Sequence, residues 1–287
     1  LEMVVKLARL IAEPQAKVVV ICQRDSLLDR SSELVDAATN LLLLAGKIGT
    51  EGSGLLLSRS HCNAQGLIDL GISPEGCRAS KTADLTGANT SAELATWLEQ
   101  GKCKGLLIVG EDPAALKTYS KLLRNAEFVA VMETLATRTT AKAHVLLPLA
   151  PLAETSGSVT SMDRTVRAFE PAFAGRAEKT GLEILELLAN KIGLSAPGSL
   201  PGIRKAIAAA QPSYAPLAIL KPNGSFVWGD PQPGNETLYL QGFAHADRKA
   251  RLTEIQAKPS AIQKAIACPT AIDRAFEENI RPQIARS

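Results

Sequence analysis

Polar and charged side chains gather at three points of this 287-residue sequence, each after an apolar run or a glycine-rich turn. Arginine and small polar side chains bind carboxylate or phosphate well, because a guanidinium can donate two parallel hydrogen bonds. The three points therefore predict a site for a bulky anionic ligand. Its candidate residues are Arg59, His61, Cys62, Asn63 and Gln65 at the first point, Gly110, Glu111 and Asp112 at the second, and Glu154, Gly157, Arg164 and Arg167 at the third.

Each point also has a purely structural interpretation. Glu111 and Asp112 precede a proline and a predicted helix, so their carboxylates could complement the helix dipole as easily as a ligand. The stretch GTEGSG matches no phosphate-loop spacing and favours a simple turn. His61 beside Cys62 has no neighbours that complete a catalytic triad or a ligand set. His144 opens an apolar strand, where a structural role is expected.

The five cysteines offer no local metal site. Two of them are never closer than 15 positions, so the sequence contains no CxxC pair for a zinc ribbon or an iron-sulfur cluster. We expect no metal bound by this chain and interpret the cysteines as small buried apolar residues in a reducing compartment. They are Cys22, Cys62, Cys77, Cys103 and Cys268.

Apolar strands alternating with amphipathic helices must position these residues. Strands are predicted over 17–22, 105–110, 127–132 and 144–148, and helices over 4–11, 33–46, 91–99, 114–124 and 179–192. This order is typical of βαβ units, so the predicted fold class is α/β, with a doubly wound, mainly parallel sheet and helices on both faces. Such sheets bind ligands at the carboxyl ends of their strands, where the three polar points fall.

A change of composition near residue 197 suggests two parts. Residues 1–196 are predicted to form a Rossmann-like α/β domain. From residue 197 onward Pro and Gly multiply, which indicates an extended segment, 197–287, that contacts a partner.

Composition excludes several function classes. With 46% hydrophobic and 21% charged residues the chain can bury a core, and a net charge of +3 leaves no footprint for a polyanion. Only 4% of residues are aromatic, so nucleic acid is not an expected partner. The longest apolar run, Leu41 to Gly46, cannot span a bilayer. Since the first 14 residues lack a signal-peptide pattern, we expect a cytoplasmic chain, or one peripheral on the cytoplasmic face of a membrane complex.

Three longer stretches carry a family resemblance. NLLLLAGKIGTEGSGLLLSRSHCNAQGLIDLG has a glycine-rich turn, an Arg, an Asn-x-Gln-Gly and an Asp-x-Gly. LLIVGEDPA is similar to a Gly-Glu-Asn-Pro turn, and HVLLPLAPLAETSGSVTSMDRTVRAFEP is similar to an Ala-Asp-Val-Val-Leu-Pro, Glu-x-x-Gly-Thr and Asn-x-x-x-Arg series. Over about residues 1–255 the chain resembles the third-domain region of the molybdopterin oxidoreductase family, which includes formate dehydrogenase large subunits and the G-type subunit of NADH-quinone oxidoreductase (complex I).

The resemblance implies a molybdopterin guanine dinucleotide with molybdenum or tungsten, shared with a partner chain. It also implies that Arg59 stands where formate dehydrogenases place their substrate arginine, which makes Arg59 an alternative catalytic residue. Family members further carry an upstream cluster domain, a metal-ligating domain and a downstream β-rich domain. The cofactor-binding positions that it implies are Arg59, Asn63, Gln65, Gly110, Glu111, Asp112, Glu154, Gly157 and Arg164.

Three positions depart from the family pattern. His144 replaces an Asp, Arg138 replaces a Glu between two threonines, and Ser161 replaces an Asn. These changes alter the hydrogen bonds that a buried cofactor would receive. They favour a chain without a redox centre of its own.

The leading hypothesis is therefore a subunit of a multi-subunit oxidoreductase of the NADH-quinone oxidoreductase or formate dehydrogenase type. It would act structurally beside an electron-transfer chain, with iron-sulfur and NADH- or formate-oxidising subunits as partners, and would not be catalytic alone. The alternative is half of a split molybdenum- or tungsten-pterin site. A third possibility is a separate α/β protein that binds a nucleotide-like anion.

Overall fold

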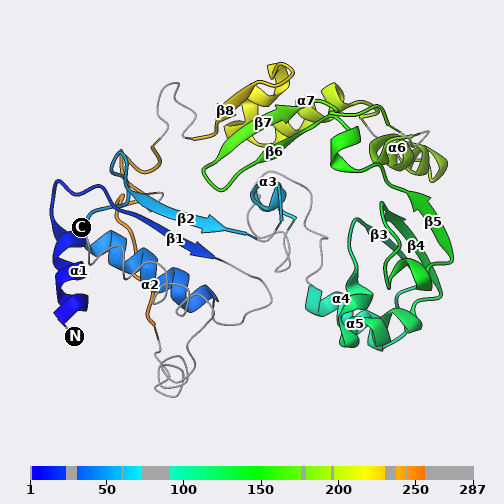
Figure 1. Ribbon diagram of the computed structural model, residues 1–287, viewed down its shortest axis with the longest axis horizontal. Coiled ribbons are helices and arrows are strands. Elements are labelled where there is room, and N and C mark those ends of the chain that lie inside the picture. Colours follow the sequence, from blue (N-terminus) through cyan, green and yellow to red (C-terminus); the bar gives the residue numbers. More distant parts are fainter. Residues whose placement is uncertain are drawn as a thin grey trace, which may run out of the picture.

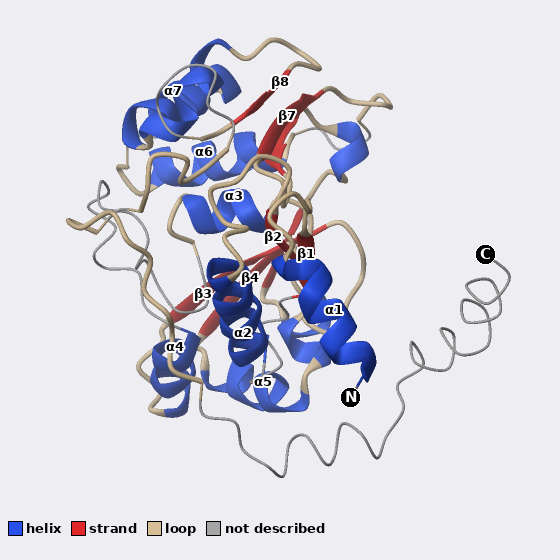
Figure 2. Ribbon diagram, turned by 90° about the vertical axis from the view of Figure 1, so that its left-hand side faces the viewer, coloured by secondary structure: helices blue, strands red, loops and turns tan. Residues whose placement is uncertain are grey.

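The structure is a computed structural model that describes residues 2–23, 31–59, 61–72, 91–175, 179–194, 197–229, 237–243 and 245–255. Its elements form an arch (Figure 1). One parallel sheet lies at each end, and an antiparallel sheet joins them at the top. Seen from the side, helices α4 and α5 lie at the opposite end of the molecule from α7 and β8 (Figure 2).

The first parallel sheet has two strands. Val20 of β1 lies opposite Leu55 of β2, and Cys22 lies opposite Leu57. Helix α2 packs on this sheet and buries Leu42 completely, and Gly46, with φ 66°, follows its end. Positive φ is easily adopted by glycine, so this residue can turn the chain towards β2. The elements are α1 (Glu2–Ala12), β1 (Val19–Gln23), α2 (Ser31–Leu44), β2 (Gly54–Ser58) and α3 (Ala64–Asp69).

A later segment is fastened to α2. The Asn40 side chain donates from Nδ2 to the carbonyl oxygen of Thr253 at 2.7 Å and accepts from the Thr253 N–H at 3.0 Å. Residues 237–243 and 245–255 therefore return to the first sheet, as Figure 1 also shows.

The second parallel sheet has the order β3-β4-β5. Its central strand is the most buried because helices α4 and α5 cover one face, and Val129 and Val131 pack there against Leu98 and Leu122. The elements are α4 (Ser91–Glu99), β3 (Gly105–Val109), the 3-10 turn η1 (Pro113–Ala115), α5 (Lys117–Leu122), the 3-10 turn η2 (Leu123–Asn125), β4 (Phe128–Glu133), the 3-10 turn η3 (Thr140–Lys142) and β5 (Val145–Pro148).

The antiparallel sheet, of order β6-β7-β8, has its own small core of Val166, Tyr214 and Leu217. Helix α6 begins with a capping box in which Thr180 and Glu183 bond each other's backbone N–H. The elements are the 3-10 turn η4 (Leu152–Glu154), β6 (Gly157–Thr160), β7 (Thr165–Phe169), α6 (Gly181–Lys191), α7 (Leu200–Ala210), the 3-10 helix η5 (Pro212–Ile219) and β8 (Ser225–Val227).

The α/β class with parallel strands and helices is confirmed, and the parallel strands divide between two sheets. Residues 197–229 differ from the predicted extended segment, because they form α7, η5 and β8. Ser199 accepts the N–H of Gly202 at the start of α7, and Pro201 falls in the first turn, where a missing N–H costs nothing. Residues 230–236 and 256–287 lie outside the described residues, and the boundary at residue 196 stays a prediction. Among the described helices, none combines the length and apolar character needed to cross a bilayer.

Candidate functional site

The first predicted point forms a small cavity at the carboxyl end of β2. Arg59 follows the strand, while Asn63 and Gln65 belong to the start of α3, and all three line a cavity of about 190 Å³. The opposite wall is the end of β6, at Thr160 and Ser161. His61 and Cys62 line the same cavity, so the structure brings all five residues of the first point together.

Asn63 joins the two walls of this cavity. Its backbone is left-handed, with φ 63°, and its Oδ1 accepts the N–H of Thr160 at 2.9 Å. Gly66 lies directly beneath, and a Cβ there would collide with the same Oδ1. The Asn-x-x-Gly spacing is thus explained by a bond between α3 and β6.

A buried hydrogen-bonded network lies behind the cavity. The Tyr214 hydroxyl donates to Asp69 Oδ2 at 2.8 Å and lies 2.9 Å from Thr160 Oγ1. Because the phenol has one proton and gives it to Asp69, the Thr160 hydroxyl is the donor to Tyr214. Gln65 Nε2 donates to Asp69 Oδ1 at 2.7 Å. The network joins α3, β6 and η5.

Burial dominates the electrostatics of this network. Desolvation raises the pKa of Asp69 above its ordinary value, although the bonds from Tyr214 and Gln65 oppose the shift. Desolvation, followed by the nearby Asp69 carboxylate, also raises the pKa of Tyr214 above its usual range. Tyr214 therefore stays a neutral donor at physiological pH.

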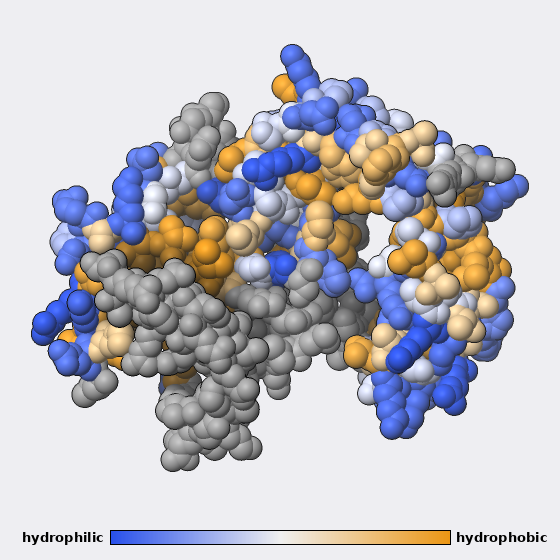
Figure 3. Space-filling view, in the orientation of Figure 1, coloured by the Kyte–Doolittle hydropathy of each residue, from blue (hydrophilic) through white to orange (hydrophobic). Residues whose placement is uncertain are grey.

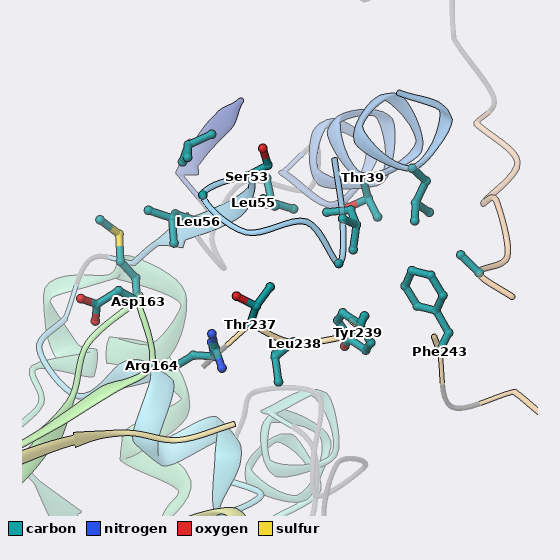
Figure 4. Close-up of a pocket in the computed structure, with 18 of the residues that line it drawn as sticks. Thr39, Ser53, Leu55, Leu56, Asp163, Arg164, Thr237, Leu238, Tyr239 and Phe243 are labelled. Atoms are coloured by element: carbon teal, nitrogen blue, oxygen red, sulfur yellow. The ribbon is translucent and has the colours of Figure 1, made fainter. Parts of the chain in front are cut away.

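Arg164 lies at a second, larger cavity. This cavity of about 750 Å³ lies between β2, the end of α2 and residues 237–243 and 245–251. Figure 4 shows Arg164 and Thr237 on the side opposite Ser53 and Leu55. Arg164 has a left-handed backbone, and its Nη1 donates to the carbonyl oxygen of Trp228 at 2.6 Å. Its guanidinium lies 5.6 Å from the centre of the Trp228 ring. The side chain thus fastens the β6–β7 turn to the residue after β8.

The second predicted point lies on the other parallel sheet. Gly110, Glu111 and Asp112 follow β3, and Asp112 accepts from both the N–H and the hydroxyl of Thr139, at 2.9 and 2.6 Å. The Thr139 hydroxyl bond is the main cause of the lowered pKa of Asp112. Thr139 Oγ1 in turn accepts the N–H of Ala114 at 3.0 Å. These bonds tie the turn after β3 to the turn after β4.

The helix predicted over 114–124 differs in the structure, where Leu116 is extended and separates η1 from the six-residue α5. Asp112 makes no cap bond, so the helix-dipole interpretation is replaced by the bonds to Thr139.

The third point is split as well. Glu154 ends the turn η4, while the carbonyl oxygen of Gly157 accepts a bond from the buried Arg204 at 2.7 Å. A Cβ at Gly157 would meet the ring of Phe169 at 2.7 Å. Arg167 donates from Nη1 to Ser161 at 2.9 Å. Gly157 and Arg167 are therefore engaged in and around the antiparallel sheet.

The described histidines and cysteines differ in their surroundings. His144 has a structural role, as predicted, because its Nδ1 accepts the N–H of Val129 at 3.0 Å and its ring stacks on Phe128. Cys22 is buried as expected, while Cys62, in the turn before α3, is exposed and Cys103 is half-buried, which corrects the prediction for these two. Cys77 and Cys268 lie outside the described residues. Within the ranges that the structure describes, no three His, Cys, Asp or Glu side chains are placed to hold a metal ion.

Sequence reasoning missed a buried lysine. Lys47 is 1% exposed, and its Nζ donates to the carbonyl oxygens of Glu13, Pro14 and Ala16 at 2.6, 3.3 and 2.8 Å. It fastens the turn after α2 to the turn between α1 and β1. The only sequence signal is a Lys directly after the glycine that ends a helix, which is too common to single out.

Comparisons with known proteins agree with the resemblance. The profile of the molybdopterin oxidoreductase family matches residues 17–191. A candidate formate dehydrogenase of Bacillus subtilis (strain 168) is 28% identical over 247 residues, which is 77% of this chain and 25% of the relative. A candidate formate dehydrogenase of Staphylococcus haemolyticus (strain JCSC1435) is 27% identical over 251 residues, 78% of this chain and 26% of the relative. The chain thus spans about a quarter of these relatives.

Proposed function

The chain belongs to the molybdopterin oxidoreductase family, and we propose that it acts as a structural subunit of a formate-dehydrogenase-like or NADH-quinone-oxidoreductase-like complex. In this role it supports an electron-transfer chain that other subunits carry, and it holds no redox centre itself. Its proposed partners are iron-sulfur subunits and subunits that oxidise NADH or formate.

One observation carries this proposal: polar groups that could hold a cofactor are used to hold the fold. Asn63 is bonded to Thr160, Asp112 to Thr139, and Arg164 to Trp228. A ligand that bound to these groups would have to break hydrogen bonds within the protein. Each broken hydrogen bond to a charged group costs about 1.5–3 kcal/mol.

The described residues also do not form a complete site for a pterin dinucleotide. Arg59 and Gln65 line a cavity of about 190 Å³, below the roughly 300–1,000 Å³ of typical cofactor sites. Glu111 and Asp112 follow a strand of the other parallel sheet. The larger cavity, of about 750 Å³, has the size of a cofactor site, but Arg164 is the one implied position among its lining residues. Within this part of the chain, the positions implied by the resemblance do not converge.

The test is isolation of the native complex through a tag on this chain. We expect other polypeptides to co-purify, with iron and any molybdenum or tungsten in stoichiometric amounts in the complex and absent from the chain expressed alone. Stoichiometric iron or molybdenum in the isolated monomeric chain would contradict the structural role.

The alternative, a pterin site shared with a second polypeptide, is favoured by the shared cavity of Arg59, Asn63 and Gln65. Arg59→Ala separates the two functions. For a structural subunit we expect turnover of the assembled complex to stay within about twofold of the original, as for the control Arg124→Ala on the distant turn η2. If Arg59 instead holds an anion at a shared site, losing about 2–4 kcal/mol of stabilisation lowers turnover by about two orders of magnitude or more, with assembly intact.

A further inference from the structure

A groove far from the candidate site runs between helix α6 and the end of strand β5. It has a volume of about 430 Å³, and its lining residues are Leu147, Pro148, Lys179, Ile184, Leu187, Leu188 and Lys191. Its walls are apolar except for the two lysines. Apolar residues gather over α6 and β5 at the right of the space-filling view (Figure 3).

Helix α6 leaves its apolar side uncovered. None of its residues is fully buried, and Leu187 and Leu188 are 49% and 37% exposed. On the neighbouring strand, Leu147 is half-buried and Pro148 is exposed, and both line the groove. A contiguous apolar surface of this kind, bordered by charged side chains, is typical of an interaction site.

The groove does not favour an added β-strand, although β5 is an edge strand of its sheet. Leu149 donates its N–H to Glu133 of β4 at 3.1 Å, so Pro148 faces the open edge by the two-residue alternation of a strand. Proline has no N–H to offer a new neighbour, and proline at an edge is a known means of blocking strand addition. A helix needs no backbone partner and is the better occupant.

The charges of the groove select the kind of helix. Lys179 precedes α6 and Lys191 ends it, twelve residues apart, which is roughly 18 Å along a helix axis. Glu183 lies near Lys179, but its carboxylate bonds the N–H and hydroxyl of Thr180 and it does not line the groove, whereas both lysines do. The groove therefore presents a cation at each end of an apolar floor.

We propose that this groove docks an amphipathic helix of a partner polypeptide, with an apolar stripe of about three turns and a carboxylate near each end. Apolar side chains at helical spacing fill the floor, and the carboxylates meet Lys179 and Lys191. The proposal concerns a different surface from the Arg59 cavity and does not depend on the structural role proposed above.

The test measures binding of a labelled synthetic helical peptide of about 14 residues to the full chain by fluorescence anisotropy. The peptide carries leucines at spacings of three and four and glutamates at both ends; a second peptide carries lysines at the ends. We expect the double substitution Lys179→Glu with Lys191→Glu to lower the affinity for the acidic peptide by about tenfold or more and to raise the affinity for the basic peptide. The control pair Lys102→Glu with Lys221→Glu, which are exposed elsewhere, should change either affinity by less than about twofold.

A second variant tests the apolar floor. Leu187→Asp, at a half-exposed position, should abolish binding of the acidic peptide, while Ile219→Asp, at an exposed position at the end of η5, should not. Circular dichroism confirms that each variant is folded.

Three results would overturn the proposal. One is equal binding of acidic and basic peptides by the original chain. Another concerns the variant with Lys179→Glu and Lys191→Glu. If it loses binding to anionic phosphatidylglycerol vesicles to the same extent as it loses binding to the peptide, a lipid surface is the occupant. The third is a carbodiimide crosslink, within one chain, from Lys179 or Lys191 to Asp273, Glu277 or Glu278, since the groove would then hold the chain's own segment.

Discussion

Replacing Lys47 with Met is expected to lower the free energy of unfolding by about 3 kcal/mol, although the two side chains are similar in length. The three N–H groups of Lys47 meet three carbonyl oxygens, of Glu13, Pro14 and Ala16. Met fills the same space but leaves these acceptors without a donor. Lys47→Arg should also destabilise, because a planar guanidinium cannot aim its donors in the same three directions. Urea denaturation measures the loss.

The control is Lys104→Met, whose side chain is 73% exposed and paired with Glu127. Exposed ion pairs contribute at most about 1 kcal/mol, so this variant should stay close to the original protein. Hydrogen exchange should further show that Lys47→Met lowers the protection of backbone N–H groups mainly in α1 and β1. Equal stability of the two variants would mean that the carbonyl groups find water instead.

The second large effect is expected from Tyr214→Phe, which should cost about 2 kcal/mol at neutral pH. Tyr214 is 3% exposed, and its hydroxyl is both the donor to Asp69 and the acceptor from Thr160. Phe keeps the ring but leaves a partly buried carboxylate and a buried hydroxyl each short of one partner. The matched control is Tyr119→Phe, at the edge of the other core.

The same network predicts a pH dependence through Asp69→Asn. Because the folded-state pKa of Asp69 is raised, the folded protein holds this proton more tightly than the unfolded chain. The stabilising contribution is complete below the unfolded-state pKa of about 3.9 and is lost as pH rises through the folded-state pKa. Asn carries no charge, so the variant should gain stability relative to the original protein between acid and neutral pH. If the difference in stability between Asp69→Asn and the original protein did not change with pH over that range, Asp69 would ionise equally well in the folded and unfolded states.

Local patterns predicted most of the regular elements. The strands β1, β3, β4 and β5 appear where continuous apolar runs were found, and such runs are typical of parallel strands. Of these four, β4 is the most buried, and the other three leave part of their apolar surface exposed. Helix α4 begins and ends as expected, and α6 begins at a capping pair that is visible as Thr180 and Glu183. These signals lie within a few residues of the elements they specify.

Long-range partners could not be predicted in the same way. Tyr214 and Asp69 are 145 positions apart, and the short strands β6, β7 and β8 gain their stability from one another and not from a local pattern. The first strand of each parallel sheet has the same kind of sequence, so nothing in the pattern assigned β1 and β3 to different sheets. The candidate residues could be chosen from their residue types. Which of them lie close together depends on how the parallel strands divide between the two sheets, and the sequence pattern does not show this.

The bond pair between Asn40 and Thr253 has a consequence for how the sequence can change. A carboxamide offers an acceptor oxygen and N–H donors, much as a peptide group does, and here the oxygen and one N–H engage the backbone of residue 253. This attachment depends on the main chain, so many side chains at position 253 would leave it intact. Position 40 has no such freedom: Asp lacks the donor and Leu lacks both groups. Substitutions are therefore expected to accumulate on one side of the contact and to be rejected on the other.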